Sequence, residues 1–107
     1  MAEFLQVSTA TETREQAMEL ARSVVAARLA AGVQVVGPVA SVFWHEGEYG
    51  EGEEWQLLFK VSADTYGRLE DHLLVHHPWK NPEVAAVPIV VGSSSYLRWL
   101  GTTTRLD

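Results

Sequence analysis

The order of strand-type and helix-type segments along this 107-residue chain constrains its fold more than any other feature. Two segments carry apolar residues at steps of three and four, which is typical of amphipathic helices, and others are short and rich in Val and aromatic residues. The expected elements are strand 4–7, helix 13–31, strand 33–45, strand 55–61, helix 64–76, strand 84–91 and helix 96–100. This β-α-β-β-α-β order with a short C-terminal helix predicts an α+β fold, the ferredoxin-like plait.

Local signals predict where the helices begin and end. Thr13 and Gln16 have capping-box spacing, and Gly32 is expected to end the first helix as a left-handed C-cap. Asp64 is the expected N-cap of the second helix, in which Tyr66, Leu69, Leu73 and His76 form one stripe. The last helix is expected to begin after a cap at Ser94 or Ser95 and to end at Gly101.

The strand segments carry three expectations of their own. The Gly37-Pro38 pair predicts a kink or bulge, because proline cannot donate to the strand ladder. Residues 46–54 hold five glutamates and three glycines, which favours a hairpin loop or a solvated extension. Residues 84–91 are apolar on both faces, so we expect a central, buried strand there.

Composition predicts one globular domain, residues 1–107, and excludes several classes of function. The net charge of −6 argues against a nucleic-acid or anionic-membrane partner, since both need a cationic face. With no cysteine, the chain cannot form disulfides, thiolate zinc sites or iron–sulfur clusters. No targeting segment or apolar run long enough for a bilayer is visible, so we expect a cytoplasmic protein.

In such a plait the helices cover one face of the sheet, and the other face needs cover as well. A sheet face that exposed Phe, Trp and Val would be an interaction surface, so we expect an oligomer. The sequence contains four tryptophans, Trp44, Trp55, Trp79 and Trp99. They could anchor an interface or line a pocket, or they could simply fill the core, and the sequence does not separate these alternatives.

Histidines provide the candidate metal ligands. His72 and His76 are four residues apart on the second expected helix, which places both imidazoles on one face, and His77 follows directly. His45 and Glu83 are the candidates for a further ligand. The alternative is that His76 completes the core stripe while His72 is solvated.

Catalytic motifs are absent from the sequence. There is no Gly-x-Ser-x-Gly elbow, no Gly-x-Gly-x-x-Gly loop and no phosphate-binding loop. The segment 55–60 does not match the aromatic pattern of RNA-binding plaits. We therefore expect no enzyme activity and no organic cofactor.

Two C-terminal blocks, residues 77–83 (HPWKNPE) and 96–100 (YLRWL), resemble those of the CutA divalent-ion-tolerance family. Looser matches lie at 29–31, 41–43, 46–47 and 57–60. The resemblance implies a tight homotrimer with inward-packed sheets and a long hairpin that reaches a neighbour. It also implies a cytoplasmic protein linked to copper and other divalent cations, an architecture shared with PII-type signalling proteins, and no established catalytic activity.

Departures from the family pattern restrict the metal ions that the site is expected to bind. Where the family has Ala-Ala-Cys this chain has Ala30-Ala31-Gly32, and the family's His-Pro-Tyr is His77-Pro78-Trp79. Without the thiolate, an imidazole and carboxylate site suits Cu(II), Zn²⁺ or Ni²⁺ better than Cu(I).

Two functions are therefore expected from the sequence. The first is a trimeric divalent-cation tolerance or response protein that binds Cu(II) or another divalent cation, with the candidate ligands His45, His72, His76 and His77. The alternative is a PII-like sensing module that binds an anionic or aromatic small molecule in clefts between subunits. Its candidate residues are Lys60, Trp79, Glu83 and Trp99.

Overall fold

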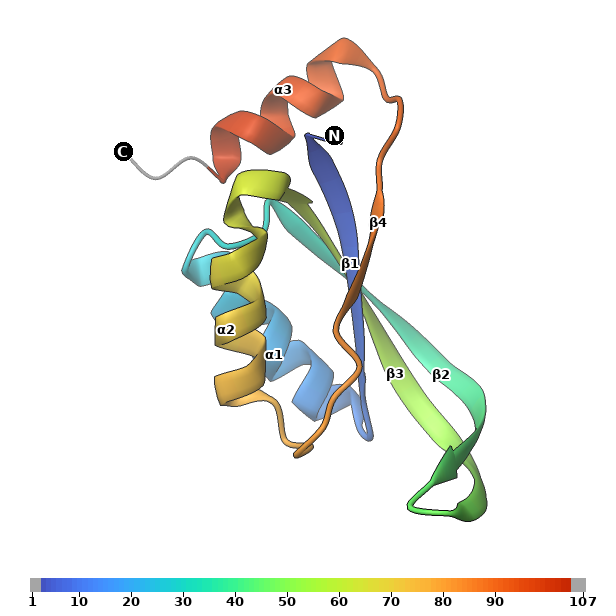
Figure 1. Ribbon diagram of the computed structural model, residues 1–107. Helices are drawn as coiled ribbons and strands as arrows, with labels where there is room; N and C mark the ends of the chain where they lie inside the picture. Colours follow the sequence, from blue (N-terminus) through green and yellow to red (C-terminus); the bar gives the residue numbers. More distant parts are fainter. Residues whose placement is uncertain (1–2, 105–107) are drawn as a thin grey trace.

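In the computed structural model, which describes residues 3–104, four antiparallel strands form one sheet in the order β2-β3-β1-β4. The elements are β1 (Phe4–Thr11), α1 (Arg14–Ala26), β2 (Gly32–His45), β3 (Glu48–Ser62), α2 (Tyr66–His76), β4 (Ala85–Pro88) and α3 (Ser94–Thr103). Helices α1 and α2 lie on one face of the sheet, and α3 lies at its end (Figure 1). The expected α+β plait is confirmed. No helix within residues 3–104 combines the length and the apolar character needed to cross a membrane.

The core lies between the sheet and the pair α1 and α2. Its largest fully buried side chains on the inner face of β3 are Leu57, Phe59 and Val61, and α2 contributes Leu69 and Leu73. Helix α1 adds small and branched residues that let it lie close to the sheet: Ala17, Leu20, Ala21 and Val24. The apolar residues of both helices thus face the sheet as expected, but His76, the last residue of the stripe predicted for the second helix, is exposed.

Helix α1 begins as expected but ends earlier. The Thr13 hydroxyl accepts from the Gln16 N–H at 3.1 Å, and the Gln16 side chain accepts from the Thr13 N–H at 3.3 Å, which completes the capping box. The helix ends at Ala26, and Arg28 adopts a positive φ of 59°. The predicted C-cap Gly32 is wrong: it is the first residue of β2, because the Ala31 N–H already pairs with Lys60 of β3.

Of the two alternatives for residues 46–54, the structure shows the solvated extension, because most of this acidic segment is strand. Only Glu46 and Gly47 form the turn, with φ values of 51° and 80° that suit a tight two-residue hairpin. From Glu48 onward the backbone pairs with β2, and the side chains of Glu48, Glu51 and Glu53 are exposed while Glu54 is half-buried. The expected bulge is confirmed by the register shift between Val36 and Val39.

Beyond this bulge, residues 39–54 form a two-stranded extension that we call the arm. It projects from the rest of the molecule in Figure 1, and the molecule measures 44 × 25 × 21 Å along its principal axes. No core residue of the described chain comes from the arm. The arm is therefore held by backbone pairing and its own side chains.

Three other boundaries differ from the expectation. Asp64 does not cap α2: it lies in a 3₁₀ turn, Ala63–Thr65, that leads into the helix. Helix α3 is capped by Ser93, whose hydroxyl accepts from the Tyr96 N–H, and it continues through Gly101. Strand β1 runs on to Thr11, since it pairs with β3 along its whole length.

The last strand is at the edge of the sheet, which corrects the prediction of a central, buried strand over 84–91. The strand is Ala85–Pro88, it pairs with β1 alone, and the Ile89 N–H also donates to the Phe4 carbonyl oxygen at 2.9 Å. Val84 and Ile89 of this segment are half-buried, whereas Val87, Val90 and Val91 are 56%, 82% and 83% exposed. The apolar pattern of this segment therefore reflects a surface without a partner in the chain rather than burial between two strands.

The sheet face away from α1 and α2 is only partly covered. Helix α3 covers its end, where Gly101 lies against Phe4 and Trp99 lies against Gly32. Side chains of neighbouring residues in a strand point to opposite faces of the sheet. Val36, Leu58 and Val87 alternate with residues that face the helices, so they lie on the open face. Because these apolar side chains lie on it, this face of the sheet needs further cover, as expected.

Substitution of Gly50 by alanine is expected to affect the arm more than the same substitution at Gly52. A Cβ at Gly50 would lie 2.5 Å from Cε1 of Phe43, which is the cross-strand partner of Gly50, whereas a Cβ at Gly52 meets nothing within 4 Å. Gly50→Ala should displace the Phe43 ring and so lower the stability of the arm relative to Gly52→Ala. Gly52→Ala is the matched control. Amide hydrogen exchange of arm residues measures the difference, and equal protection in both variants would contradict it.

Candidate metal site

Two of the expected metal ligands lie together at the C-terminal end of α2. The rings of His72 and His76 stack with their centroids 4.1 Å apart and their planes at 26°. Their four-residue spacing on one helix produces this contact. His72 is half-buried and His76 is exposed, so the alternative of a core His76 beside a solvated His72 is wrong.

Hydrogen bonds define which ring nitrogens of this pair are free. The Ser23 hydroxyl donates to the carbonyl oxygen of Leu20 at 2.8 Å, so its oxygen accepts from Nε2–H of His72 at 2.9 Å. Nδ1–H of His76 donates to the carbonyl oxygen of His72 at 2.9 Å. The lone pairs left for a cation are therefore those on Nδ1 of His72 and on Nε2 of His76.

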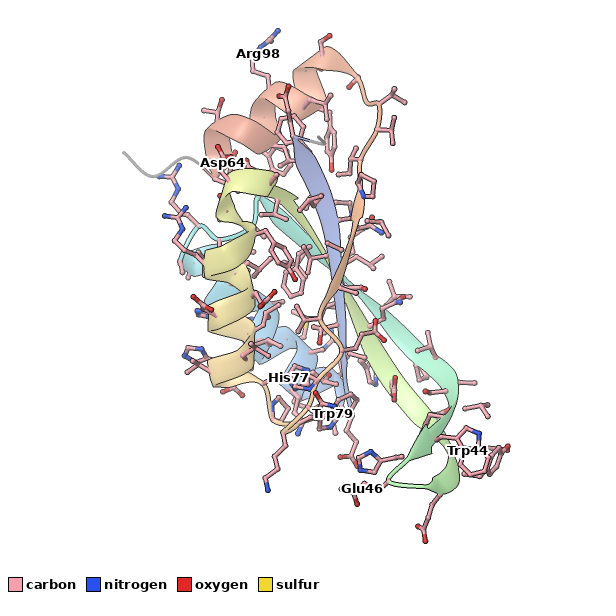
Figure 2. The ribbon with its side chains drawn as sticks, in the orientation of Figure 1. Trp44, Glu46, Asp64, His77, Trp79 and Arg98 are labelled. Atoms are coloured by element: carbon pink, nitrogen blue, oxygen red, sulfur yellow. The ribbon has the colours of Figure 1, made fainter. Side chains whose placement is uncertain are left out.

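His77 makes different use of its ring. It is buried, its Nε2–H donates to the carbonyl oxygen of Ala10 at 2.8 Å, and its Nδ1 accepts from the Trp79 N–H at 3.0 Å. Figure 2 shows His77 and Trp79 close together below α2, and their ring centroids are 5.3 Å apart. Because both nitrogens are engaged, His77 has no lone pair to offer a cation in this arrangement.

The fourth histidine is remote from the other three. His45 is exposed at the end of the arm, where its Nε2 lies 3.8 Å from Oε1 of Glu46. Glu46 lies at the end of the arm in Figure 2, well apart from His77. Across residues 3–104, no three His, Asp or Glu side chains are grouped so that they could hold one ion. Within one chain the expected histidines thus supply a pair, not a full coordination sphere.

The residues expected to bind a small molecule are spread out rather than gathered in a pocket. Lys60 and Glu83 are engaged on the open sheet face: Lys60 Nζ donates to Gln34 at 3.3 Å, and the Ser8 hydroxyl donates to Glu83 at 3.3 Å. Trp99 lies over Gly32, the strand partner of Lys60. Trp79 is beside His77, near the other end of the sheet.

A groove between α1 and α2 was missed by the sequence analysis. It has a volume of about 210 Å³ and is lined by Gln16, Glu19, Leu20, Ser23, His76 and Pro78. The polar residues of α1 follow one another at steps of three and four, which is the signal that was available. Their meeting with His76 depends on how two helices pack, which the spacing along one helix does not define.

Burial affects the protonation of two histidines. Desolvation, together with the neighbouring His76, lowers the pKa of His72, and desolvation lowers the pKa of His77 although its bond to Ala10 opposes the shift. Both rings therefore favour the neutral form that a cation or a backbone N–H requires.

The metal-free chain is expected to lose stability as the pH falls below the ordinary histidine value of 6.5. Because the folded pKa of His77 lies below the unfolded one, the unfolded chain takes up the proton first, and stability falls from there down to the folded pKa. Urea unfolding from about pH 7.5 to about pH 5 measures this slope. His77→Gln should reduce the slope, and the remainder is expected from His72, whose pKa is lowered as well. A full slope in His77→Gln would contradict the assignment to His77.

Comparison with known proteins identifies the family. The family model described as CutA1 divalent ion tolerance protein matches residues 5–103. The divalent-cation tolerance protein CutA of Thermus thermophilus is 34% identical over 97% of this chain and 99% of its own length. The chloroplastic CutA 1 of Oryza sativa is 36% identical over 86% of this chain. This chain spans about half of the rice and Arabidopsis thaliana relatives, 52% and 50%.

Solved structures agree with this assignment. CutA1 from Oryza sativa has a TM-score of 0.93 at 32% identity, covering 99% of this chain and 97% of that one. CutA from Xylella fastidiosa has a TM-score of 0.93 at 28% identity, covering 97% of this chain and 100% of that one. The fold, the match over residues 5–103 and the full-length identity to the Thermus protein together show that this chain belongs to the CutA1 divalent ion tolerance family.

Proposed function

We propose that this protein is a homotrimeric, non-catalytic divalent-cation tolerance or response protein of the cytoplasm, which binds Cu(II) or a similar cation through the imidazoles of α2. The stacked pair of His72 and His76, with one free nitrogen on each ring, is the observation that carries the proposal. The names of the relatives, which refer to divalent-cation tolerance, support the class of ligand.

The donor set fits cations of intermediate softness. Neutral imidazole suits Cu(II), Zn²⁺ and Ni²⁺, and the chain has no cysteine to favour Cu(I). A net charge of −6 also favours the approach of a cation. In this proposal His77 is a positioning residue that holds the Trp79 backbone, and His45, exposed at the end of the arm beside Glu46, is not a ligand of this ion.

Calorimetric titration of Cu(II) into the purified protein tests the proposal. We expect binding in the wild type that weakens below about pH 6, where imidazole takes up a proton. The double variant His72→Ala with His76→Ala should lose it, whereas His45→Ala, which removes an exposed imidazole from the arm, should keep it. Equal heats for the wild type and the double variant would contradict the role of the pair.

The trimer is supported by the apolar surface that one chain leaves exposed. On the arm Val42, Trp44 and Tyr49 are 65%, 75% and 58% exposed, and at the sheet edge the valines after β4 are more exposed still. An unpaired strand edge and apolar side chains of this extent are typical of an assembly interface. A neighbouring copy that packs against the open face and receives the arm would cover both.

A PII-like sensing role is the second candidate. It is supported by the half-exposed Trp99, which lies over Gly32 beside Lys60 and so offers a ring and a cation on one surface. Tryptophan fluorescence during titration with a panel of anionic metabolites tests this role. A flat response that persists while Cu(II) still quenches the fluorescence would favour the metal function.

A further inference from the structure

We propose that the groove between α1 and α2 is a divalent-cation site in which Glu19 of α1 and His76 of α2 are the protein ligands. The inference rests on the proposed metal function and refines it. Glu19 takes the place of His72 as the second ligand, while His72, whose Nε2 is bonded to Ser23, positions the His76 ring. Glu19 and His76 line the same groove of about 210 Å³.

The other groups of the groove are already engaged or have nothing to donate to a cation. The Gln16 side-chain oxygen accepts from the N–H groups of Glu12 and Thr13 in the capping box. The Ser23 hydroxyl donates to Leu20 and accepts from His72. Leu20 and Pro78 contribute apolar side chains.

Two lone-pair donors then remain, one on each wall. Glu19 makes no side-chain hydrogen bond or ion pair within residues 3–104, and Nε2 of His76 is free. The oxygen of a carboxylate and the nitrogen of an imidazole are the donors that Zn²⁺, Ni²⁺ and Cu(II) accept together.

His76 is also held in the way that metal-bound histidines usually are. A ligating imidazole typically donates its other ring N–H to a backbone carbonyl or carboxylate, which fixes the tautomer and the ring orientation. In His76 that role belongs to Nδ1–H, which donates to the carbonyl oxygen of His72. The stacked His72 ring, itself tied to Ser23, further restricts the His76 ring.

The composition of the site predicts its behaviour. With two protein ligands and no third His or acidic residue grouped with them among the described residues, water would fill the remaining positions. Such an open site exchanges its ion readily, unlike the closed four-ligand sites of structural zinc. The bound ion would also join α1 to α2, so it should raise the melting temperature by linkage.

Zn²⁺ titration by calorimetry, with melting curves at saturating Zn²⁺, tests this site against a matched control. Glu15 is an exposed acid one helical turn before Glu19, so Glu15→Gln removes the same charge from the same helix outside the groove. We expect Glu19→Gln and His76→Ala each to weaken Zn²⁺ binding about tenfold or more and to abolish the rise in melting temperature, with Glu15→Gln within about twofold of the wild type.

Three results would overturn the inference, and they differ in what they mean for the proposed function. If Glu19→Gln matches Glu15→Gln while His76→Ala loses binding, the carboxylate assignment fails and the imidazole function stands. If His76→Ala binds Zn²⁺ like the wild type, the ion lies elsewhere on the protein. If the wild type binds neither Zn²⁺ nor Cu(II), the groove site and the proposed function fail together.

Discussion

Leu73→Ala is expected to lower the free energy of unfolding by about 2–5 kcal/mol. The Leu73 side chain is fully buried between α2 and the sheet, in the cluster that also contains Phe59 and Leu69. Its removal takes away apolar contacts and leaves a cavity that the surrounding side chains fill only in part. Urea unfolding monitored by circular dichroism measures the loss.

The adjacent residue provides the control for this substitution. Leu74 follows Leu73 in the same helix but is 51% exposed, so Leu74→Ala makes the same chemical change on the solvent side. We expect it to change the stability by no more than about 0.5 kcal/mol. Comparable losses in the two variants would mean that a partner covers the exposed side of α2.

Features set by neighbours in the sequence were predicted well. The capping box of Thr13 and Gln16, the stripe of Leu69 and Leu73 and the bulge after Val36 all depend on contacts or preferences within a few residues. Residues 46–54 were predicted as a hairpin loop or a solvated extension, and the structure shows the extension, closed by a two-residue turn at Glu46 and Gly47. Charged residues are compatible with a strand whose two faces are both solvated, and a composition argument does not recognise that case.

Features set by the assembly of the sheet were not predictable in this way. The segment 84–91 has the apolar pattern of a central strand, yet the strand order puts β4 at the edge, with β1 and β3 in the middle. Gly32 has the character of a helix C-cap, yet Ala31 is already paired to Lys60. In both cases long-range pairing overrides a correct local preference.

The candidate site also combines features that depend on sequence neighbours with features that depend on long-range packing. Helical spacing alone predicted that His72 and His76 share a face, and their rings do stack. It did not predict that His77, one residue further, turns inward to the Ala10 carbonyl, or that α1 brings Glu19 to the same groove as His76. These placements follow from tertiary packing, which makes α1 one wall of the groove.

Removal of the arm is expected to convert the proposed trimer into monomers without unfolding the chain. Val39 and Glu54 are the first cross-strand pair beyond the bulge, so an Asn-Gly turn in place of residues 40–53 closes the hairpin with favourable geometry. The core cluster contains no residue from this segment, so the shortened chain should retain its helices and a cooperative unfolding transition.

Sedimentation equilibrium of the full-length and the shortened chain measures the change in mass. The Trp44→Ala variant then tests whether this one side chain of the arm anchors the interface. The Trp44 ring is 75% exposed in the single chain, so its loss should leave the intrinsic fold intact, whereas Trp55 packs against the core. If the ring is an interface anchor, Trp44→Ala should shift the assembly toward monomers at low protein concentration, as loss of an aromatic hot spot does. A shortened chain that sediments as the same oligomer as the full-length protein would contradict the role of the arm, and a monomeric wild type would contradict the trimer.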